Sequence, residues 1–164
     1  MAVHDPRHPR PVSSPTQPIL IPVRIPGEGS WYRLIRPWRY VWDLPDGTRQ
    51  CLVVPRGFCL DGASVPRLLW TLTGITPDGL HRAAAVAHDY LYRHAGKLPA
   101  GVHRVLSPGV GWETAGWKDA AHVWTREEAD RLFARLLREC GVGKRRRRIM
   151  YLGVRLGGWM SWKG

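Results

Sequence analysis

The chain has 164 residues, of which 44% are hydrophobic, and its formal net charge at pH 7 is +12. This length suits one domain with a sizeable core, and the apolar content excludes wholesale disorder. The strong positive charge indicates an acidic partner, which can be nucleic acid, an anionic phospholipid surface or a negatively charged neighbouring subunit.

The hydropathy of the chain and the composition of its first residues indicate in which compartment the protein is made. No run of about 18 apolar residues occurs, so the sequence predicts no transmembrane helix. Residues 1–17 are rich in Pro and Ser and lack the apolar core of a signal peptide. We therefore expect synthesis and folding in the cytoplasm, without a signal peptide.

The cysteines Cys51, Cys59 and Cys140 show neither CxxC spacing nor a Cys/His zinc pattern. Reduced and mostly buried thiols are the default expectation. A disulfide between Cys51 and Cys59 across a hairpin is the alternative.

The order of elements predicts an α+β fold, in which a small antiparallel sheet or hairpin packs on two or three helices. Residues 1–18 form an extended Pro-rich arm, and residues 19–164 form a single domain that ends in a basic helix. Residues 19–25 alternate in part and predict an edge strand. Residues 38–42 and 49–54 are β-rich runs on either side of an Asp-Gly step, which predicts a hairpin.

A second Asp-Gly step, Asp61-Gly62, follows this hairpin. Asp61 offers a carboxylate and the backbone around Gly62 offers carbonyl oxygens, and a hard cation such as calcium takes ligands of this kind. The competing interpretation is a plain Asx turn that caps a short helix over residues 66–72. Both interpretations stay open from the sequence.

Small residues followed by His88, Asp89 and Tyr92 organise the middle of the chain. The residues from Ala83 to Ala87 are compatible with a helix and permit close approach of another element. On a helix, His88 and Tyr92 share a face, whereas Asp89 is turned by about 100° from His88. The His-Asp pair is either a functional polar site or a core pair satisfied by structural hydrogen bonds.

Two further segments follow this helix. Residues 97–118 are rich in Gly, Pro and Trp, and we expect a long surface insertion there. Thr125 and Glu128 predict a capping box at the start of a helix that ends at Gly141. Asp130 lies on the apolar stripe of this helix, where a carboxylate needs a partner, and an imidazole across a helix pair is a natural one.

The C-terminal segment begins with five consecutive cations, residues 144–148, and continues as an apolar stretch with Trp159 and Trp162. Three interpretations stay open. The segment can be a core helix whose basic start is solvated or docks on a subunit. It can also rest on an anionic membrane, or contact a phosphate backbone through its arginines.

Four motifs follow one another along the chain. They are Asp61-Gly62-Ala63-Ser64-Val65-Pro66, Ala87-His88-Asp89-Tyr90-Leu91-Tyr92, Ala129-Asp130-Arg131-Leu132-Phe133, and Met150-Tyr151 with Val154-Arg155 and Gly157. In this order they resemble a family of small phage and prophage proteins that is known as a domain of unknown function. The resemblance implies a protein made in the host cytoplasm that joins other virion subunits in an oligomeric assembly.

The spacing of His88 and Tyr92, followed by Asp130 on a later helix, is also similar, more weakly, to the helix pair of secreted and bacterial phospholipases A2. That resemblance implies that His88 is the general base that activates water. Asp130 would orient His88, and Tyr92 would support Asp130. It further implies that Asp89 binds calcium together with Asp61 and carbonyl groups around Gly62.

Three function classes follow from these observations. The favoured one is a phage structural or assembly-associated protein, such as a tail, baseplate or neck component, that keeps a hydrolase-like His/Asp site. The second is a calcium-dependent, phospholipase-A2-like hydrolase that acts on envelope lipid. The third is a basic nucleic-acid-binding protein, which the charge favours although no recognised motif is present. The sequence leaves open whether the protein is an enzyme.

Overall fold

The computed structural model describes residues 15–25, 29–60, 81–109 and 116–162. Within these ranges the chain forms seven β-strands, three α-helices and one short 3₁₀ helix. The strands are β1 (Leu20–Ile25), β2 (Gly29–Leu34), β3 (Trp38–Asp43), β4 (Arg49–Val54), β5 (Cys59–Leu60), β6 (His103–Leu106) and β7 (Lys118–Asp119). The helices are α2 (Arg82–Arg93), α3 (Arg126–Glu139), α4 (Lys144–Gly157) and the 3₁₀ helix η1 (Gly158–Met160).

The described strands form two small antiparallel sheets. One sheet has the order β1-β2-β5, and the other has the order β3-β4-β6-β7. The predicted hairpin is present as β3 and β4, with Asp43 opposite Arg49 at its closed end. Gly47 has a φ of +82° in the connecting turn, a backbone conformation that favours glycine. The predicted strand over residues 19–25 is present as β1, at the edge of its sheet.

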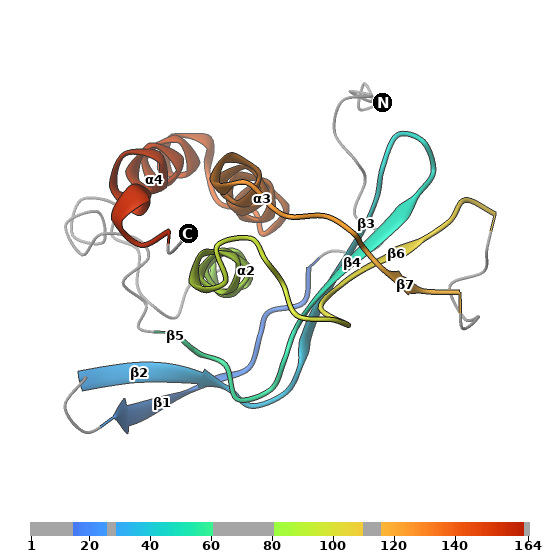
Figure 1. Ribbon diagram of the computed structural model, residues 1–164. Coiled ribbons are helices and arrows are strands. Elements are labelled where there is room, and N and C mark those ends of the chain that lie inside the picture. Colours follow the sequence, from blue (N-terminus) through green and yellow to red (C-terminus); the bar gives the residue numbers. More distant parts are fainter. Residues whose placement is uncertain (1–14, 26–28, 61–80, 110–115, 163–164) are drawn as a thin grey trace.

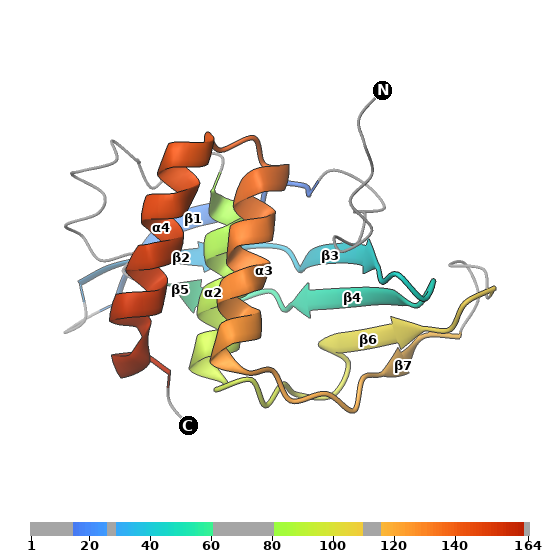
Figure 2. The same cartoon turned by 90° about the horizontal axis from the view of Figure 1, so that it is seen from above.

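The three α-helices of the described residues form a layer of their own. Figure 1 looks along the helices and shows α2 nearest to β5, with α3 and α4 farther from β1 and β2. Figure 2 shows the three helices running side by side. Because α3 packs against both α2 and α4, a side chain of α3 can meet residues from two other helices.

The local sequence explains the close packing of α2 and the start of α3. α2 is buried along most of its length, because Ala83, Ala84 and Ala87 let neighbouring elements approach closely. α3 starts at the predicted capping box. Thr125 Oγ1 accepts from the backbone N–H of Glu128 at 3.2 Å, and the Glu128 carboxylate accepts from the Thr125 N–H at 2.7 Å.

The four-stranded sheet is joined to α3 by a row of aromatic rings on β3. Trp38, Tyr40 and Trp42 are buried, and the Tyr40 ring centroid lies 6.2 Å from that of Trp38 and 5.1 Å from that of Trp42. The Tyr40 hydroxyl donates to Glu139 Oε2 at 2.8 Å, which ties the end of α3 to the sheet.

The predicted α+β class is confirmed, with two sheets in place of the single one expected. The prediction of a surface insertion over residues 97–118 is wrong. This segment contributes β6 and the first residue of β7 to the four-stranded sheet. His103 anchors β6: its Nδ1 accepts from the Trp124 indole at 3.2 Å and its Nε2 donates to Gln50 Oε1 at 2.9 Å. Burial lowers the pKa of His103 to about 4, so this ring is neutral.

Most of the predicted N-terminal arm, residues 1–14, lies outside the described residues. Its last described residues lie on the folded domain. The Thr16 carbonyl accepts from the Trp38 indole at 2.7 Å, and the Gln17 amide donates to Cys140 Sγ at 3.3 Å.

Two further expectations concern the cysteines and the membrane. Cys51, Cys59 and Cys140 are free thiols, so the alternative disulfide between Cys51 and Cys59 is not formed. Cys51 is buried, as expected for a reduced thiol in a core. Among the described helices, none has both the length and the apolar character needed to cross a bilayer.

Candidate functional site

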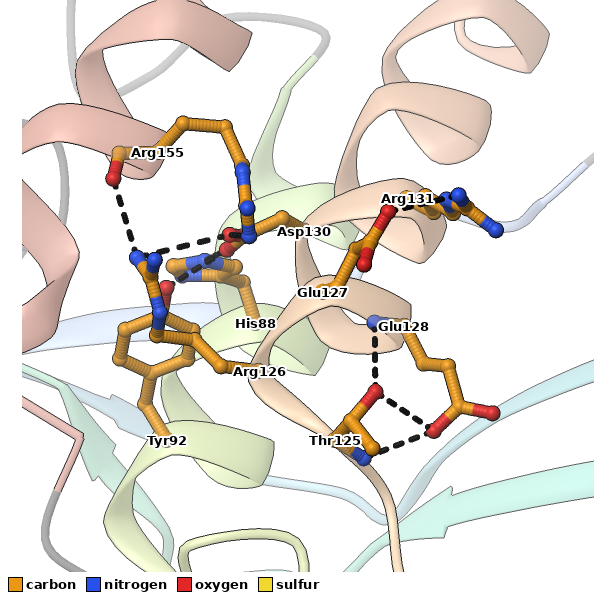
Figure 3. A network of polar contacts seen from close by, with 9 residues as sticks. All are labelled: His88, Tyr92, Thr125, Arg126, Glu127, Glu128, Asp130, Arg131 and Arg155. Atoms are coloured by element: carbon orange, nitrogen blue, oxygen red, sulfur yellow. Dashed lines mark hydrogen bonds and ion pairs between the residues drawn. The ribbon is translucent and has the colours of Figure 1, made fainter.

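Asp130, in the second turn of α3, is the centre of the polar network shown in Figure 3. Its carboxylate is 0% exposed. His88 Nε2 lies 2.9 Å from Oδ1, the Tyr92 hydroxyl lies 2.6 Å from the same oxygen, and an Arg155 guanidinium nitrogen lies 2.9 Å from Oδ2. One carboxylate therefore joins α2, α3 and α4.

The charges of the neighbours fix the protonation of this network. Burial alone would raise the pKa of Asp130, but hydrogen bonds from His88, Tyr92 and Arg155 outweigh burial and lower it. The ionised carboxylate can only accept, so Nε2 of His88 carries the proton in their hydrogen bond. Burial and the contact with Asp130 raise the pKa of Tyr92, so its hydroxyl stays neutral and donates as well.

Helix geometry explains why two residues of α2 reach the same carboxylate. His88 and Tyr92 are one turn apart on one face, and their ring centroids lie 4.0 Å from each other. Phe133, one turn after Asp130 on α3, lies 5.0 Å from the His88 ring. The structure thus brings together the three residues that the sequence predicted as catalytic: His88, Tyr92 and Asp130.

Two arginines complete the network, and neither was predicted as a site residue. Arg155 comes from α4, and Arg126 from the first turn of α3. Arg126 donates to the Arg155 carbonyl at 3.0 Å and lies 3.8 Å from Asp130 Oδ2. For Arg155, the sequence feature that could have indicated a buried partner is its position in the apolar part of α4, between Val154 and Leu156.

The other ring nitrogen of His88, Nδ1, lies near Asp89. It is 4.0 Å from Asp89 Oδ1, and it has no hydrogen-bond partner among the described residues. Burial alone would lower the pKa of His88, but the carboxylates of Asp130 and Asp89 outweigh burial and raise it above its usual value. The His88 side chain is 1% exposed, so the whole pair lies inside the protein.

Of the three predicted calcium ligands, the structure describes only Asp89. Asp61 and Gly62 lie outside the described residues. Asp89 is buried on α2, directly after His88. Within the described ranges, no group of three or more His, Cys, Asp and Glu side chains could hold a metal ion. A carboxylate suits calcium, and a calcium site at Asp89 needs further oxygen ligands beside this carboxylate.

An imidazole held in this way has one nitrogen fixed by a carboxylate, whereas the other is buried and has no hydrogen-bond partner among the described residues. Asp130 accepts the Nε2 proton, which fixes the tautomer and the orientation of the His88 ring. When the ring is neutral, Nδ1 can take a proton from a water or hydroxyl placed against it. The arrangement can therefore act as a general base, and it can equally serve as a polar core that joins three helices.

Comparison with known proteins gives a family and a bacterial relative, and no solved structure matches the chain. The relative, from Sinorhizobium fredii, carries the name "Uncharacterized protein y4jT". It is 31% identical to this chain over 86 residues, which are 52% of this chain and 25% of that protein. The chain therefore spans about a quarter of the length of the curated relative.

The family comparison covers most of the elements that build the network. Residues 32–154 match the family described as "Protein of unknown function (DUF1353)". The matched range includes His88, Tyr92 and Asp130 and ends one residue before Arg155. It covers well over half of the chain, so this protein belongs to the DUF1353 family.

Proposed function

We propose that this protein is a hydrolase in which His88 activates water for attack on an ester. The observation that carries the proposal is the orientation of the His88 ring. Its Nε2 is held by Asp130, and its Nδ1 has no hydrogen-bond partner among the described residues. A purely structural histidine would gain from satisfying both nitrogens, since an unsatisfied buried polar atom costs about 1–3 kcal/mol.

In the proposed reaction, His88 Nδ1 takes a proton from water while the water oxygen bonds to the carbonyl carbon of the ester. The imidazolium that forms is stabilised by Asp130, which still accepts the Nε2 proton. The Nδ1 proton then passes to the leaving alcohol as its C–O bond breaks, which yields a carboxylic acid and an alcohol. Tyr92 and Arg155 hold the Asp130 carboxylate in place throughout.

The proposal includes a phospholipid ester as substrate and calcium as cofactor, as the resemblance to phospholipases A2 implies. Asp89 would hold the ion, together with Asp61 and the carbonyl groups around Gly62. Bound calcium supplies positive charge that stabilises the developing oxyanion. The buried carboxylate of Asp89, 4.0 Å from His88 Nδ1, supports this assignment.

Replacement of His88 by glutamine tests the general base. We expect the purified protein to release fatty acid from phospholipid vesicles in the presence of calcium. We expect His88→Gln to lower kcat by about a hundredfold or more, because general-base catalysis contributes a factor of that order. The measurement is the initial rate of fatty acid release, compared among proteins that show the same thermal unfolding midpoint.

His94→Gln at the end of α2 is the matched control, because the His94 ring packs on Tyr90 and lies outside the Asp130 network. Equal turnover by the wild type and His88→Gln would rule out the catalytic role. Isothermal titration with calcium gives a second readout that does not need turnover. Binding should be lost in Asp89→Asn and kept in Asp46→Asn, whose carboxylate lies in the β3–β4 turn. Equal binding by both variants removes calcium from the proposal.

A second candidate is a phage structural or assembly-associated protein of a tail, baseplate or neck. The observation that favours it is the depth of the network: Asp130 and His88 are buried, and the Asp130 carboxylate is satisfied by three donors without a substrate. A satisfied polar core of this kind can specify how three helices pack and requires no turnover. The protein would then bind other virion subunits in an oligomeric assembly.

Sedimentation of a phage lysate tests the second candidate. For a virion subunit made in the host cytoplasm, we expect the protein to move with assembled particles through a density gradient. We expect the His88→Gln protein to stay with the particles as well, since a structural role does not need the imidazole as a base. Protein that remains only in the free fraction of the lysate contradicts this candidate.

A further inference from the structure

The outer face of α4 carries a line of apolar side chains that the fold leaves exposed. Leu152, Leu156 and Trp159 are 56%, 76% and 65% exposed, and Ile149 precedes them on the same line. Steps of three and four residues place Ile149, Leu152 and Leu156 on one face of α4, and Trp159 follows at the same spacing in η1. The opposite face of α4 is buried through Met150 and Val154, so the exposed line is not part of the core.

A basic groove with a volume of about 590 Å³ lies between α3 and α4. The cations that line it are Arg131, Arg135 and Arg138 of α3 and Lys144, Arg147 and Arg148 of α4. On α4 these positions lie next to the apolar line around the helix axis, on the side that faces α3. The groove and the apolar line together form one surface, which we call the α4 surface.

Few acidic groups offset the charge of the α4 surface. α4 itself contains no Asp or Glu. Within the described residues, Lys144, Arg147 and Arg148 form no ion pair with a carboxylate. Arg131 does pair with Glu127, at 2.6 Å on the exposed side of α3. Arg135 and Arg138 lie near the Glu139 carboxylate, so among the described residues the cations of the surface without an acidic partner are those of α4, beside exposed leucines and a tryptophan.

The presence of cations next to exposed apolar side chains distinguishes between two possible partners of this surface, a nucleic acid and an anionic bilayer. A nucleic acid backbone would satisfy the cations and leave Leu152, Leu156 and Trp159 exposed. An anionic phospholipid bilayer presents phosphates at its surface and an apolar region directly below, which matches both features. Tryptophan is also favoured at the boundary between these two regions.

We propose that the α4 surface binds an anionic phospholipid bilayer. The groove takes headgroup phosphates, and Leu152, Leu156 and Trp159 enter the upper part of the acyl region. Trp162, the other tryptophan of the C-terminal segment, does not belong to this surface, because its ring packs on Tyr92 at a centroid distance of 5.0 Å. The inference does not depend on the proposed hydrolase activity, since it rests on the outer face of α4 and not on His88.

Sedimentation with lipid vesicles tests this inference. The full-length protein should bind vesicles of phosphatidylcholine with phosphatidylglycerol and bind pure phosphatidylcholine weakly. The double variant Arg147→Gln/Arg148→Gln should lower the partition coefficient by about tenfold or more, because each cation near an anionic surface contributes about fivefold. Leu156→Ser should lower it by about tenfold, because it removes apolar area that enters the acyl region.

Matched controls lie on the strands. Arg36→Gln/Arg39→Gln removes two exposed cations beside and on β3, and Ile21→Ser removes an exposed apolar side chain of β1. Neither control should change the partition coefficient. His88→Gln should also bind vesicles like the wild type, which separates failure of the hydrolase proposal from failure of this one.

Two outcomes overturn the inference. One is equal binding to anionic and zwitterionic vesicles by the wild type. The other is a pattern with two parts. Leu156→Ser binds vesicles as the wild type does, and Arg147→Gln/Arg148→Gln loses affinity both for vesicles and for a short DNA duplex. That second pattern would identify the groove as a nucleic acid site.

Discussion

Asp130→Asn is expected to lower the free energy of unfolding by about 3–5 kcal/mol, the usual cost of removing one charge from a buried ion-paired group. The amide would keep an acceptor oxygen for one neighbour but would turn its NH₂ group toward another donor. The Arg155 guanidinium would then lose the carboxylate that offsets its charge, and His88 would lose the acceptor that holds its Nε2 proton. Urea unfolding followed by circular dichroism measures the loss.

Glu127→Gln is the control for the Asp130 variant, because it removes a carboxylate from the same helix. Glu127 pairs with Arg131 on the exposed surface, and such pairs contribute about 0.2–1 kcal/mol. A double-mutant cycle with Asp130→Asn and Arg155→Gln should show a coupling energy above about 1 kcal/mol, since the two side chains are in contact. Strictly additive effects would contradict the network described here.

Gly158→Ala is expected to cost about 1–3 kcal/mol, because it inserts a methyl group into a filled space. A Cβ on Gly158 would lie 2.5 Å from the Tyr92 hydroxyl oxygen and 2.9 Å from the nearest ring carbon. The ring cannot easily move aside, since its hydroxyl donates to Asp130 and the ring packs against His88 and Trp162. Thermal or urea unfolding of the variant gives the magnitude.

The effect of Gly158→Ala should depend on the Tyr92 hydroxyl, which a second variant tests. In a Tyr92→Phe background the closest atom is gone, so the added methyl group should cost less than in the wild type. Gly143→Ala is a reference substitution, because a Cβ there would meet no atom within 4 Å. If Gly158→Ala costs the same with and without the hydroxyl, the contact with the hydroxyl oxygen is not the cause of the destabilisation.

The elements that the sequence predicted well are those with strong local signals. The β3–β4 hairpin follows from an Asp-Gly step at Gly47, where a positive φ is needed. The start of α3 follows from Thr125 and Glu128, which satisfy each other's backbone groups within four residues. In both cases the residues that decide the structure are neighbours in the chain.

The division into two sheets could not be predicted, because it depends on pairing between distant segments. β6 pairs with β4 in the register Leu52 opposite His103, and β7 pairs with β6 through two residues. Strands this short have no clear alternation in sequence. Their position is fixed by tertiary contacts such as those of His103 with Gln50 and Trp124, which no local pattern shows.

The candidate site was partly predictable for the same reason. The spacing of His88 and Tyr92 places them on one helix face. The carboxylate of Asp130 lies on the apolar stripe of α3, where burial requires a hydrogen-bond or ion-pair partner. The contribution of Arg155 was not predictable, because it depends on how α4 packs against α3. The predicted ligands Asp61 and Gly62 lie outside the described residues.

The start of α4 is electrostatically unfavourable as a helix end. Its first residues are the cations from Lys144 to Arg148, placed at the positive end of the helix dipole, and its N-cap, Gly143, supplies no side-chain hydrogen bond. A cation in this position costs about 0.3–1 kcal/mol, and cations one turn apart also repel each other. An anionic layer against this end would offset both the unfavourable interaction with the helix dipole and the repulsion among the cations. The first turns of α4 would thus be more stable against such a layer than in its absence.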